Sequence, residues 1–262
     1  MTLLSGNALV TGATGGIGQA IARALAAHGA TVTVTGRRVE VLEPLASDIS
    51  GRAIACDLSR RDEVDRLVQE VGQVDMLVAN AALPGAAELT DLTQEQIDGM
   101  LEVNLRAPIA LARALVPPMV SRRRGHLVFI SSLNGKAATP ATSIYAAAKF
   151  GLRGFALCLR EDLRPHGVGV SNVMPGFIRD AGMFAESGAA PPPGIGTGTP
   201  KQVGTAVVRA IERDKLEISV APLRQRALAR FAMMTPEFSG RLAGSAATKA
   251  ADAIASGQTD KR

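Results

Sequence analysis

The stretch Thr11-Gly12-Ala13-Thr14-Gly15-Gly16-Ile17-Gly18 decides the fold of this chain. It follows the apolar run 8–11, leads into a helical pattern over residues 17–28, and is followed by a second β-branched run at 31–35. Glycines between a strand and a helix permit a tight turn and a close approach of a pyrophosphate, which the helix N-terminus binds through its free N–H groups. The stretch therefore predicts a dinucleotide site.

The alternation of strand and helix continues from this turn to residue 220. We expect helices at 39–46, 60–71, 94–119, 143–164 and 200–212, and strands ending near residue 56 and at 75–79, 126–130, 167–173 and 217–220. Seven near-continuous apolar strands indicate a parallel sheet with helices on both faces. The predicted fold is a Rossmann-type, doubly wound α/β fold in a single domain over residues 1–221.

Composition and charge exclude several classes of protein. The chain has 262 residues, 47% of them hydrophobic, and a formal net charge of +5. Residues 1–200 carry 18 basic and 18 acidic side chains, so the excess lies in residues 201–262, with 11 against 6. One Tyr and no Trp leave few stacking groups for a nucleic acid. With no apolar run long enough to span a membrane and no signal-peptide pattern, we expect a cytoplasmic protein that binds no nucleic acid.

The cysteines and histidines give no metal-binding pattern. Cys56 and Cys158 lie far apart and are expected to be buried thiols. His28, His126 and His166 fall at a helix end, a strand start and a loop, where solvated or capping histidines are expected.

Two arginines follow the second strand, where a dinucleotide site contacts the adenosine ribose. The sequence there reads Thr35-Gly36-Arg37-Arg38, without the carboxylate that a ribose with free hydroxyls favours. A guanidinium binds a 2′-phosphate through charge-assisted, bidentate hydrogen bonds. We therefore predict NADP(H) rather than NAD(H), with Arg37 as the principal contact and Arg38 as the secondary one; solvation of a helix start is the alternative.

The only tyrosine of the chain, Tyr145, stands four residues before Lys149 and thirteen after Ser132. Positions i and i+4 share one face of a helix, so the ammonium is expected near the phenol. A positive charge at that distance favours the phenolate, and we expect it to lower the pKa of Tyr145 toward neutral pH. A phenol of this kind can give or take a hydroxyl proton while a hydride moves to or from a nicotinamide.

Together these motifs resemble the short-chain dehydrogenase/reductase family in its common Tyr-x-x-x-Lys form. The resemblance covers about residues 5–220 and includes Cys56-Asp57-Leu58, Asn80-Ala81-Ala82, Val103-Asn104-Leu105 and Pro175-Gly176. It implies four catalytic residues: Asn104, Ser132, Tyr145 and Lys149. It implies cofactor contacts from Gly12, Thr14, Gly15, Gly16, Ile17, Gly18, Arg37, Arg38, Asp57, Leu58, Asn80, Tyr145, Lys149, Pro175, Gly176 and Ile178.

The resemblance also implies particular roles for these residues. Tyr145 would be the proton donor and acceptor, Ser132 would hold the substrate oxygen, and Asn104 would fix a water in a relay from Lys149. The chain departs from the family at Asp180, which replaces a threonine that bonds the nicotinamide carboxamide. Its carboxylate can accept from the carboxamide or be neutralised by Arg179, so we assign it no catalytic role.

Two further segments lie outside this pattern. Residues 177–200, rich in Gly, Ala and Pro, resemble the substrate lid of the family and suit a hydrophobic substrate. Residues 222–262 form a basic extension, partly helical, with a frayed end. Within it, residues 222–234 predict a helix with Leu223, Ala227, Phe231 and Met234 on one stripe. We expect that helix to pack on its own domain; a pocket cover, a subunit contact and a membrane surface are the alternatives.

The sequence thus predicts an NADP(H)-dependent oxidoreductase that interconverts a carbonyl and a secondary alcohol. One alternative is a 3-oxoacyl-thioester reductase, in which the run Arg122-Arg123-Arg124 receives an acidic acyl carrier; a structural role at the helix end is expected first for these arginines. A non-catalytic NADP(H) sensor is the alternative from another class. A homodimer or homotetramer is expected by analogy with the family.

Overall fold

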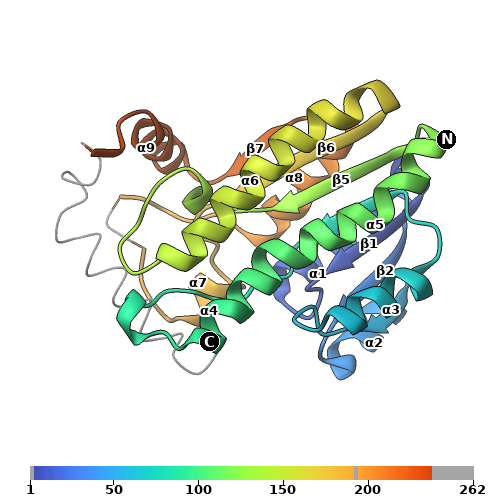
Figure 1. The fold of residues 1–262 in the computed structure, drawn as a ribbon, viewed down its shortest axis with the longest axis horizontal. Helices are drawn as coiled ribbons and strands as arrows, with labels where there is room; N and C mark the ends of the chain where they lie inside the picture. The colour runs from blue at the N-terminus through green and yellow to red at the C-terminus, as the bar shows by residue number, and fades with distance from the viewer. Residues whose placement is uncertain (1–2, 192–193, 238–262) are drawn as a thin grey trace.

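The computed structural model describes residues 3–191 and 194–237 as seven strands flanked by helices (Figure 1). The strands are β1 (Asn7–Thr11), β2 (Thr31–Gly36), β3 (Arg52–Ala55), β4 (Met76–Ala79), β5 (Gly125–Ile130), β6 (Val168–Pro175) and β7 (Glu217–Val220). The α-helices are α1 (Gly16–Ala27), α2 (Val39–Asp48), α3 (Arg61–Val71), α4 (Gln94–Leu101), α5 (Ala107–Arg122), α6 (Ser143–Leu163), α7 (Met183–Glu186), α8 (Pro200–Glu212) and α9 (Leu223–Met234). Short turns of other helix types are η1 (Leu3–Ser5), η2 (Leu89–Asp91), η3 (Glu102–Arg106), η4 (Leu133–Gly135) and η5 (Arg164–His166).

The strands form one parallel sheet in the order β3-β2-β1-β4-β5-β6-β7, which confirms the predicted Rossmann-type fold. Val10 of β1 is in register with Val34 of β2 on one side and with Val78 of β4 on the other. The chain order reverses between β1 and β4. In doubly wound sheets such a switch point opens a crevice outside the carboxyl ends of the strands, which is where ligands bind.

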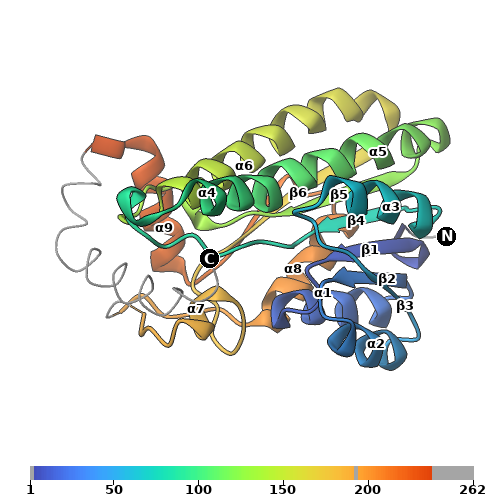
Figure 2. The same cartoon turned by 60° about the horizontal axis from the view of Figure 1, so that its bottom comes forward.

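Helices cover both faces of the sheet, as Figure 2 shows. The core under α1, α2 and α8 contains Ile21, Leu42 and Val207, and the core under α3, α5 and α6 contains Leu67 and Leu111. These five side chains are fully buried. At about 1.5–3 kcal/mol for each large aliphatic side chain removed from water, the two cores supply the main stabilisation of the sheet.

The helix predicted over residues 94–119 is broken in the structure. It consists of α4, the π-helical segment η3 and α5, and the last of these extends to Arg122. Within η3, the side chain of Asn104 bonds to the backbone of Leu83, and Pro108 has no N–H to give the carbonyl of Asn104 an α-helical hydrogen bond. Both features favour the wider π turn over a continuous α-helix.

The predicted lid, residues 177–200, begins and ends as a paired segment. Ile178 and Gly198 form a parallel bridge. The N–H of Arg179 donates to the carbonyl of Gly198 at 3.0 Å, and the N–H of Gly198 donates to the carbonyl of Phe177 at 2.8 Å. The short helix α7 lies between these ends. Loops closed by their own ends are typical of functional surface loops.

Two expectations for single side chains are wrong. His126 is 2% exposed and its Nε2 lies 2.8 Å from Ser171 Oγ, because β5 is covered on both faces from its first residue. Cys56 is buried as expected, whereas Cys158 is exposed because it lies on the outer side of α6.

The described part of the C-terminal extension contains the predicted helix, α9. The frayed end expected for this extension lies in residues 238–262, outside the described residues. Among the described residues, no helix is both long and apolar enough to cross a membrane.

Candidate active site

The predicted site residues lie at one edge of the sheet. The glycine turn follows β1, Arg37 follows β2, Asp57 follows β3, Asn80 follows β4 and Ser132 follows β5. Because all these strands are parallel, their carboxyl ends meet at the same edge. The fold therefore brings together residues that are up to 121 positions apart in the chain.

The glycine turn requires its first and last glycines. Gly12 has a φ of +65°, and a Cβ there would lie 2.6 Å from Cα of Ala81. A Cβ on Gly18 would lie 2.4 Å from the carbonyl oxygen of Gly12. The turn thus packs backbone against backbone, a geometry that only glycine allows at these two positions.

Asn80 and Thr11 hold this turn against the loop after β4. Asn80 Nδ2 donates to the carbonyls of Thr11 at 2.9 Å and Gly12 at 3.2 Å. In return, Thr11 Oγ1 accepts from the N–H groups of Asn80 and Ala81 at 3.0 and 3.1 Å. Asn80 therefore acts on the predicted cofactor site by fixing the glycine turn.

The N-terminus of α1 fits a pyrophosphate. Its N-cap, Gly15, provides no side-chain hydrogen bond, and the first turn contains no acidic residue. A Cβ on Gly15 would meet only the carbonyl of Gly12, at 3.6 Å, so this side of the turn is open. Uncapped N–H groups and the positive end of the helix dipole are suited to an anion.

At the adenosine side, the two arginines differ in their contacts. Arg38 donates to the carbonyl of Thr14 at 2.9 Å and so braces the glycine turn. Arg37 is exposed and forms no hydrogen bond or ion pair within the described residues. Its guanidinium is therefore available for a 2′-phosphate, whereas that of Arg38 is partly engaged.

Asp57 and Leu58 complete the adenosine side. Oδ1 of Asp57 accepts from the backbone N–H of Ser59 at 3.0 Å and from its hydroxyl at 2.8 Å. Leu58 is 6% exposed and packs in the core under α3, so only its backbone can face a cofactor.

The catalytic candidates Tyr145 and Lys149 lie one turn apart on α6 and face Ser132 at the end of β5. Lys149 is 1% exposed; its Nζ donates to the carbonyl of Ile130 at 3.0 Å and lies 5.6 Å from the centre of the Tyr145 ring. The hydroxyl of Ser131 donates to the carbonyl of Lys149 at 3.0 Å, which fixes α6 against β5. The Ser132 hydroxyl accepts from the N–H of Asn134 at 3.1 Å, and its interaction with the phenol favours the ionised form of Tyr145.

The predicted lowering of the pKa of Tyr145 is wrong for this structure. Burial raises the pKa of the phenol to about 12, and the hydrogen bond from Ser132 only partly opposes it. Burial also lowers the pKa of Lys149 to about 8. Helical spacing predicts the attraction between the ammonium and the phenolate. It does not predict the loss of hydration that both groups suffer when they are buried.

Asn104 links the catalytic helix region to the loop after β4. Its Oδ1 accepts from the N–H of Leu83 at 2.6 Å, its Nδ2 donates to the carbonyl of Leu83 at 3.0 Å, and its side chain is fully buried. Both polar atoms of the Asn104 side chain are therefore occupied by the backbone of Leu83. The backbone carbonyl, which Pro108 cannot bond, is the group of Asn104 that suits a relay water.

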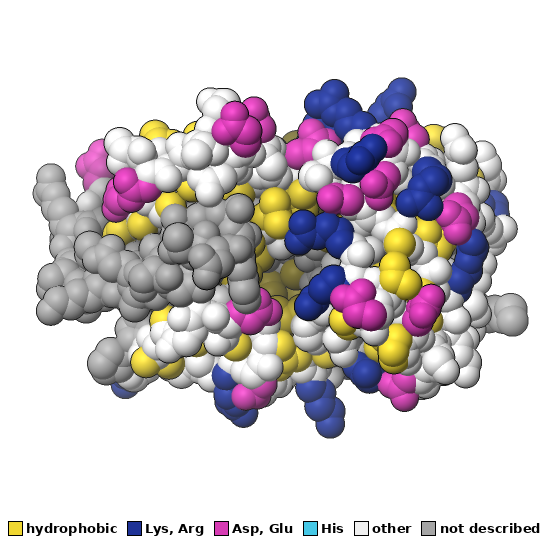
Figure 3. Space-filling view, turned by 90° about the horizontal axis from the view of Figure 1, so that it is seen from below, with side chains coloured by type: hydrophobic (Ala, Val, Ile, Leu, Met, Phe, Trp, Pro, Cys, Tyr) yellow, Lys and Arg dark blue, Asp and Glu magenta, His cyan; other side chains and the backbone are white. Residues whose placement is uncertain are grey.

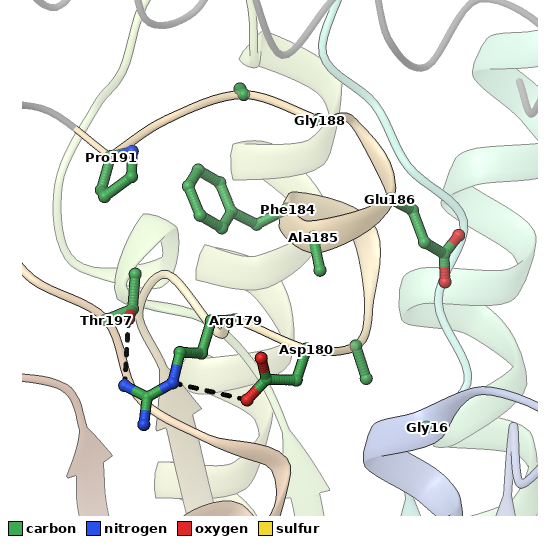
Figure 4. A pocket seen from close by; sticks show the side chains of 11 residues that line it. Gly16, Arg179, Asp180, Phe184, Ala185, Glu186, Gly188, Pro191 and Thr197 are labelled. Carbon is green, nitrogen blue, oxygen red and sulfur yellow. Dashed lines mark hydrogen bonds and ion pairs between the residues drawn. The ribbon is translucent and has the colours of Figure 1, made fainter.

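The lid forms a cavity of about 800 Å³ beside the glycine turn (Figure 4). Figure 4 shows Arg179 between Asp180 and Thr197, at 3.4 and 3.5 Å from their side-chain oxygens, with Phe184 and Pro191 above them. Arg179 therefore neutralises Asp180, one of the two outcomes expected for this carboxylate.

The start of the lid lies directly on the glycine turn. A Cβ on Gly16 would come within 2.5 Å of the Cβ of Ala181, and one on Gly182 would lie 2.9 Å from Ile17. Ile178 is 3% exposed, so its backbone is the part available to a nicotinamide. Seen from below, hydrophobic side chains line a hollow in the described surface, with Lys or Arg at its edge (Figure 3).

Gln225 of α9 contacts the lid and was not among the residues predicted from the sequence. This side chain is 6% exposed; its Oε1 accepts from the N–H of Phe177 at 3.4 Å, and its Nε2 donates to the carbonyl of Gly196 at 2.9 Å. A Cβ on Gly176 would lie 1.9 Å from Oε1 of Gln225, so the Pro175-Gly176 motif also makes room for α9. No sequence signal identified this residue, because the hydrophobic pattern predicted that the apolar side chains of α9 face the protein, which leaves Gln225 on the surface.

Comparison with known sequences gives one family. Residues 6–191 match the sequence model of the family described as short chain dehydrogenase. The chain is 42% identical to "Nodulation protein G" of Rhizobium sp., over 66% of this chain and 74% of the relative. It is 35% identical to "Ketoacyl reductase HetN" of Nostoc sp., over 84% of this chain and 80% of the relative.

Comparison with solved structures agrees with the sequence match. A metagenomic short-chain oxidoreductase, crystallised in complex with NADP, superposes with a TM-score of 0.72 and 34% identity. The match covers 84% of this chain and 99% of that protein.

Proposed function

This chain belongs to the short-chain dehydrogenase/reductase family and is an NAD(P)-dependent oxidoreductase; from that premise we propose that it uses NADP(H) to interconvert a hydrophobic carbonyl compound and its secondary alcohol. The observation that carries the proposal is the grouping of Ser132, Tyr145 and Lys149 at the same edge of the sheet as the glycine turn. When bound, the cofactor supplies or accepts the hydride.

The residues of the chain supply the acid–base chemistry. With its pKa raised to about 12, the Tyr145 phenol is protonated at neutral pH and is ready to donate to a carbonyl oxygen. In this proposal the Ser132 hydroxyl, which interacts with the phenol, holds the same oxygen. Lys149, with a pKa of about 8, lies behind the phenol and can return a proton through water held by Asn104. A protonated phenol is the state of Tyr145 that proton donation to a carbonyl requires.

The preference for NADP(H) rests on Arg37 and Arg38. Among the comparisons, the NADP complex of the metagenomic oxidoreductase supports it. An exposed guanidinium after β2 attracts the 2′-phosphate of NADPH. NADH has a neutral hydroxyl at that position, which the guanidinium binds less strongly.

Substitution of Arg37 tests that preference. In Arg37→Ala we expect kcat/KM for NADPH to fall about 10- to 100-fold, the range of one charge-assisted bidentate contact, with little change for NADH. Arg113, which is exposed on α5 and is not among the predicted cofactor contacts, provides the control Arg113→Ala. Equal efficiency of the native protein with NADH and NADPH would refute the preference.

A hydrophobic substrate is supported by the lid. Phe184, Ala185, Ala189 and Pro191 line the cavity. Of its three charged side chains, Arg179 and Asp180 pair with each other, and Glu186 is the third. A lining made mostly of small and apolar side chains suits a hydrophobic substrate.

A 3-oxoacyl-thioester reductase is the second candidate, favoured by the similarity to a ketoacyl reductase. Docking of an acidic carrier on Arg122–Arg124 is not supported by their position. Arg122 donates to the carbonyl of Val74 at 3.1 Å and Arg123 to that of Pro165 at 3.0 Å. Both precede β5, so the strand, about 20 Å long, separates them from Ser132 at its other end.

An NADPH oxidation assay over ketones, quinones, steroids and 3-oxoacyl thioesters tests the proposed function. We expect turnover of at least one hydrophobic class. Binding of NADPH without turnover of any class would instead favour the remaining alternative, a non-catalytic NADP(H) sensor. A homodimer or homotetramer remains our proposal for the assembly.

A further inference from the structure

Helix α9 turns its apolar side chains away from the protein. Gln225 and Ala229, one turn apart, form the face that packs on the body and are each 6% exposed. On the opposite face, Leu223 and Met234 are 77% and 78% exposed. A helix of a globular protein ordinarily packs its apolar stripe on the core. Helix α9 therefore packs on its own domain, as expected, but it does so through Gln225 and Ala229 and not through its apolar stripe.

Contacts on the inner face fix this orientation. Gln225 bonds to Phe177 and Gly196, one at each end of the lid. Ala229 packs with Leu133 of η4 in a small apolar cluster. Rotation of α9 to bury its apolar stripe would break both hydrogen bonds and leave buried polar groups without partners.

We call the exposed apolar face the outward stripe; it consists of Leu223, Ala227, Phe231 and Met234. At 100° per residue, Arg226 and Arg230 flank it on one side and Arg224 on the other. All three arginines are exposed, and the helix contains no acidic residue. Figures 1 and 2 both show α9 at one end of the molecule, projecting beside the lid.

We propose that the outward stripe docks on a membrane surface of anionic phospholipid. A helix with an exposed apolar stripe between arginines suits such an interface. The apolar side chains enter the boundary of the acyl chains, and the arginines reach the phosphates. Each basic residue near an anionic surface strengthens binding about fivefold. The three arginines together therefore contribute on the order of a hundredfold.

The charges of the helix disfavour a second copy of this chain as the occupant. A symmetric contact through the outward stripe is isologous, so it brings the face that carries Arg224, Arg226 and Arg230 against the same basic face of the other copy. Like charges in contact across an interface are repulsive. An anionic surface neutralises the same arginines instead.

Docking through α9 has a consequence for the substrate, and this consequence alone rests on the proposed function. Since Gln225 joins α9 to both ends of the lid, a docked helix holds the lid against the bilayer. Hydrophobic carbonyl compounds that partition into lipid would then reach the cavity directly.

The test is sedimentation of the full-length protein with vesicles of phosphatidylcholine, with and without phosphatidylglycerol. We expect binding only to the anionic vesicles, and weaker binding at high salt. The triple variant Arg224→Gln, Arg226→Gln, Arg230→Gln should bind about a hundredfold more weakly. Leu223→Ser with Met234→Ser should also lose binding, and these side chains are too exposed for the change to unfold the protein.

Matched controls carry the same changes elsewhere on the surface. Arg209→Gln, Arg213→Gln, Lys215→Gln removes equal charge at the end of α8, and Leu89→Ser removes an apolar side chain that is 55% exposed. Both should bind like the native protein. Absence of binding, equal loss in the controls, or a change of oligomeric state in the Leu223 and Met234 variant would overturn the proposal. Sedimentation needs no turnover, so failure of the proposed function would leave this result unchanged.

Discussion

At the scale of single residues, burial decides the chemistry of the active site. Tyr145 and Lys149 lie close together, yet the pKa of each is shifted in the direction that favours its uncharged form, because burial removes both groups from water. The residue types and their spacing were predictable from the sequence. The direction of the pKa shift of Tyr145 was not, because it depends on how deeply α6 is covered.

His126 provides a second example and a prediction for stability. Burial lowers the pKa of its imidazole from 6.5 to about 4. Between these values the unfolded chain binds a proton that the native protein does not, so the stability rises with pH and is lost as pH falls from 6.5 to 4. The loss from this side chain should reach about 3 kcal/mol.

Urea unfolding of native protein and His126→Gln across this pH range measures the effect. The difference in free energy of unfolding between the two proteins should shrink as pH falls. His166→Gln, at an exposed histidine, serves as the control and should follow the native protein. Parallel curves for the native protein and His126→Gln would show that the imidazole is not buried in its neutral form.

At the scale of elements, hydrophobic periodicity located most helices and strands but not the way each one packs. The strands and the helix 200–212 agree closely with expectation because their burial follows their pattern. The break at η3 depends on a hydrogen bond between Asn104 and a loop 21 residues earlier, which no local pattern contains. The orientation of α9 likewise depends on the lid ends that Gln225 binds.

The contact between α9 and the lid yields a prediction for Gln225. Gln225→Ala removes both hydrogen bonds, so we expect a loss of about 2 kcal/mol in stability and faster proteolysis within the lid. KM for the substrate should rise more than kcat falls, because the lid is the segment that we propose to bind the substrate whereas Tyr145 is untouched.

Arg226→Ala, on the exposed side of the same helix, is the matched control. It should leave both lid proteolysis and KM unchanged. If Gln225→Ala behaved in the same way, the hydrogen bonds from α9 would have no part in holding the lid.

At the scale of the whole molecule, the parallel sheet explains why so much of the site was predictable. Once strands and glycine turn were recognised, parallel order alone placed Asp57, Asn80 and Ser132 at one edge. The charge balance was also informative: the excess of basic residues lies beyond residue 200, outside the catalytic pattern. Which surface these basic residues serve required the structure, since it depends on the direction in which α9 faces.

The central claim, that Tyr145 is the proton donor of an NADP(H)-dependent reductase, is tested most directly by Tyr145→Phe. Two quantities are measured in the native and the variant protein: the turnover of a carbonyl substrate, and the binding of NADPH, which is monitored by the fluorescence of NADPH. We predict a loss of turnover on the order of 1,000-fold with NADPH binding retained, because only the hydroxyl is removed. Turnover equal to that of the native protein would contradict the account.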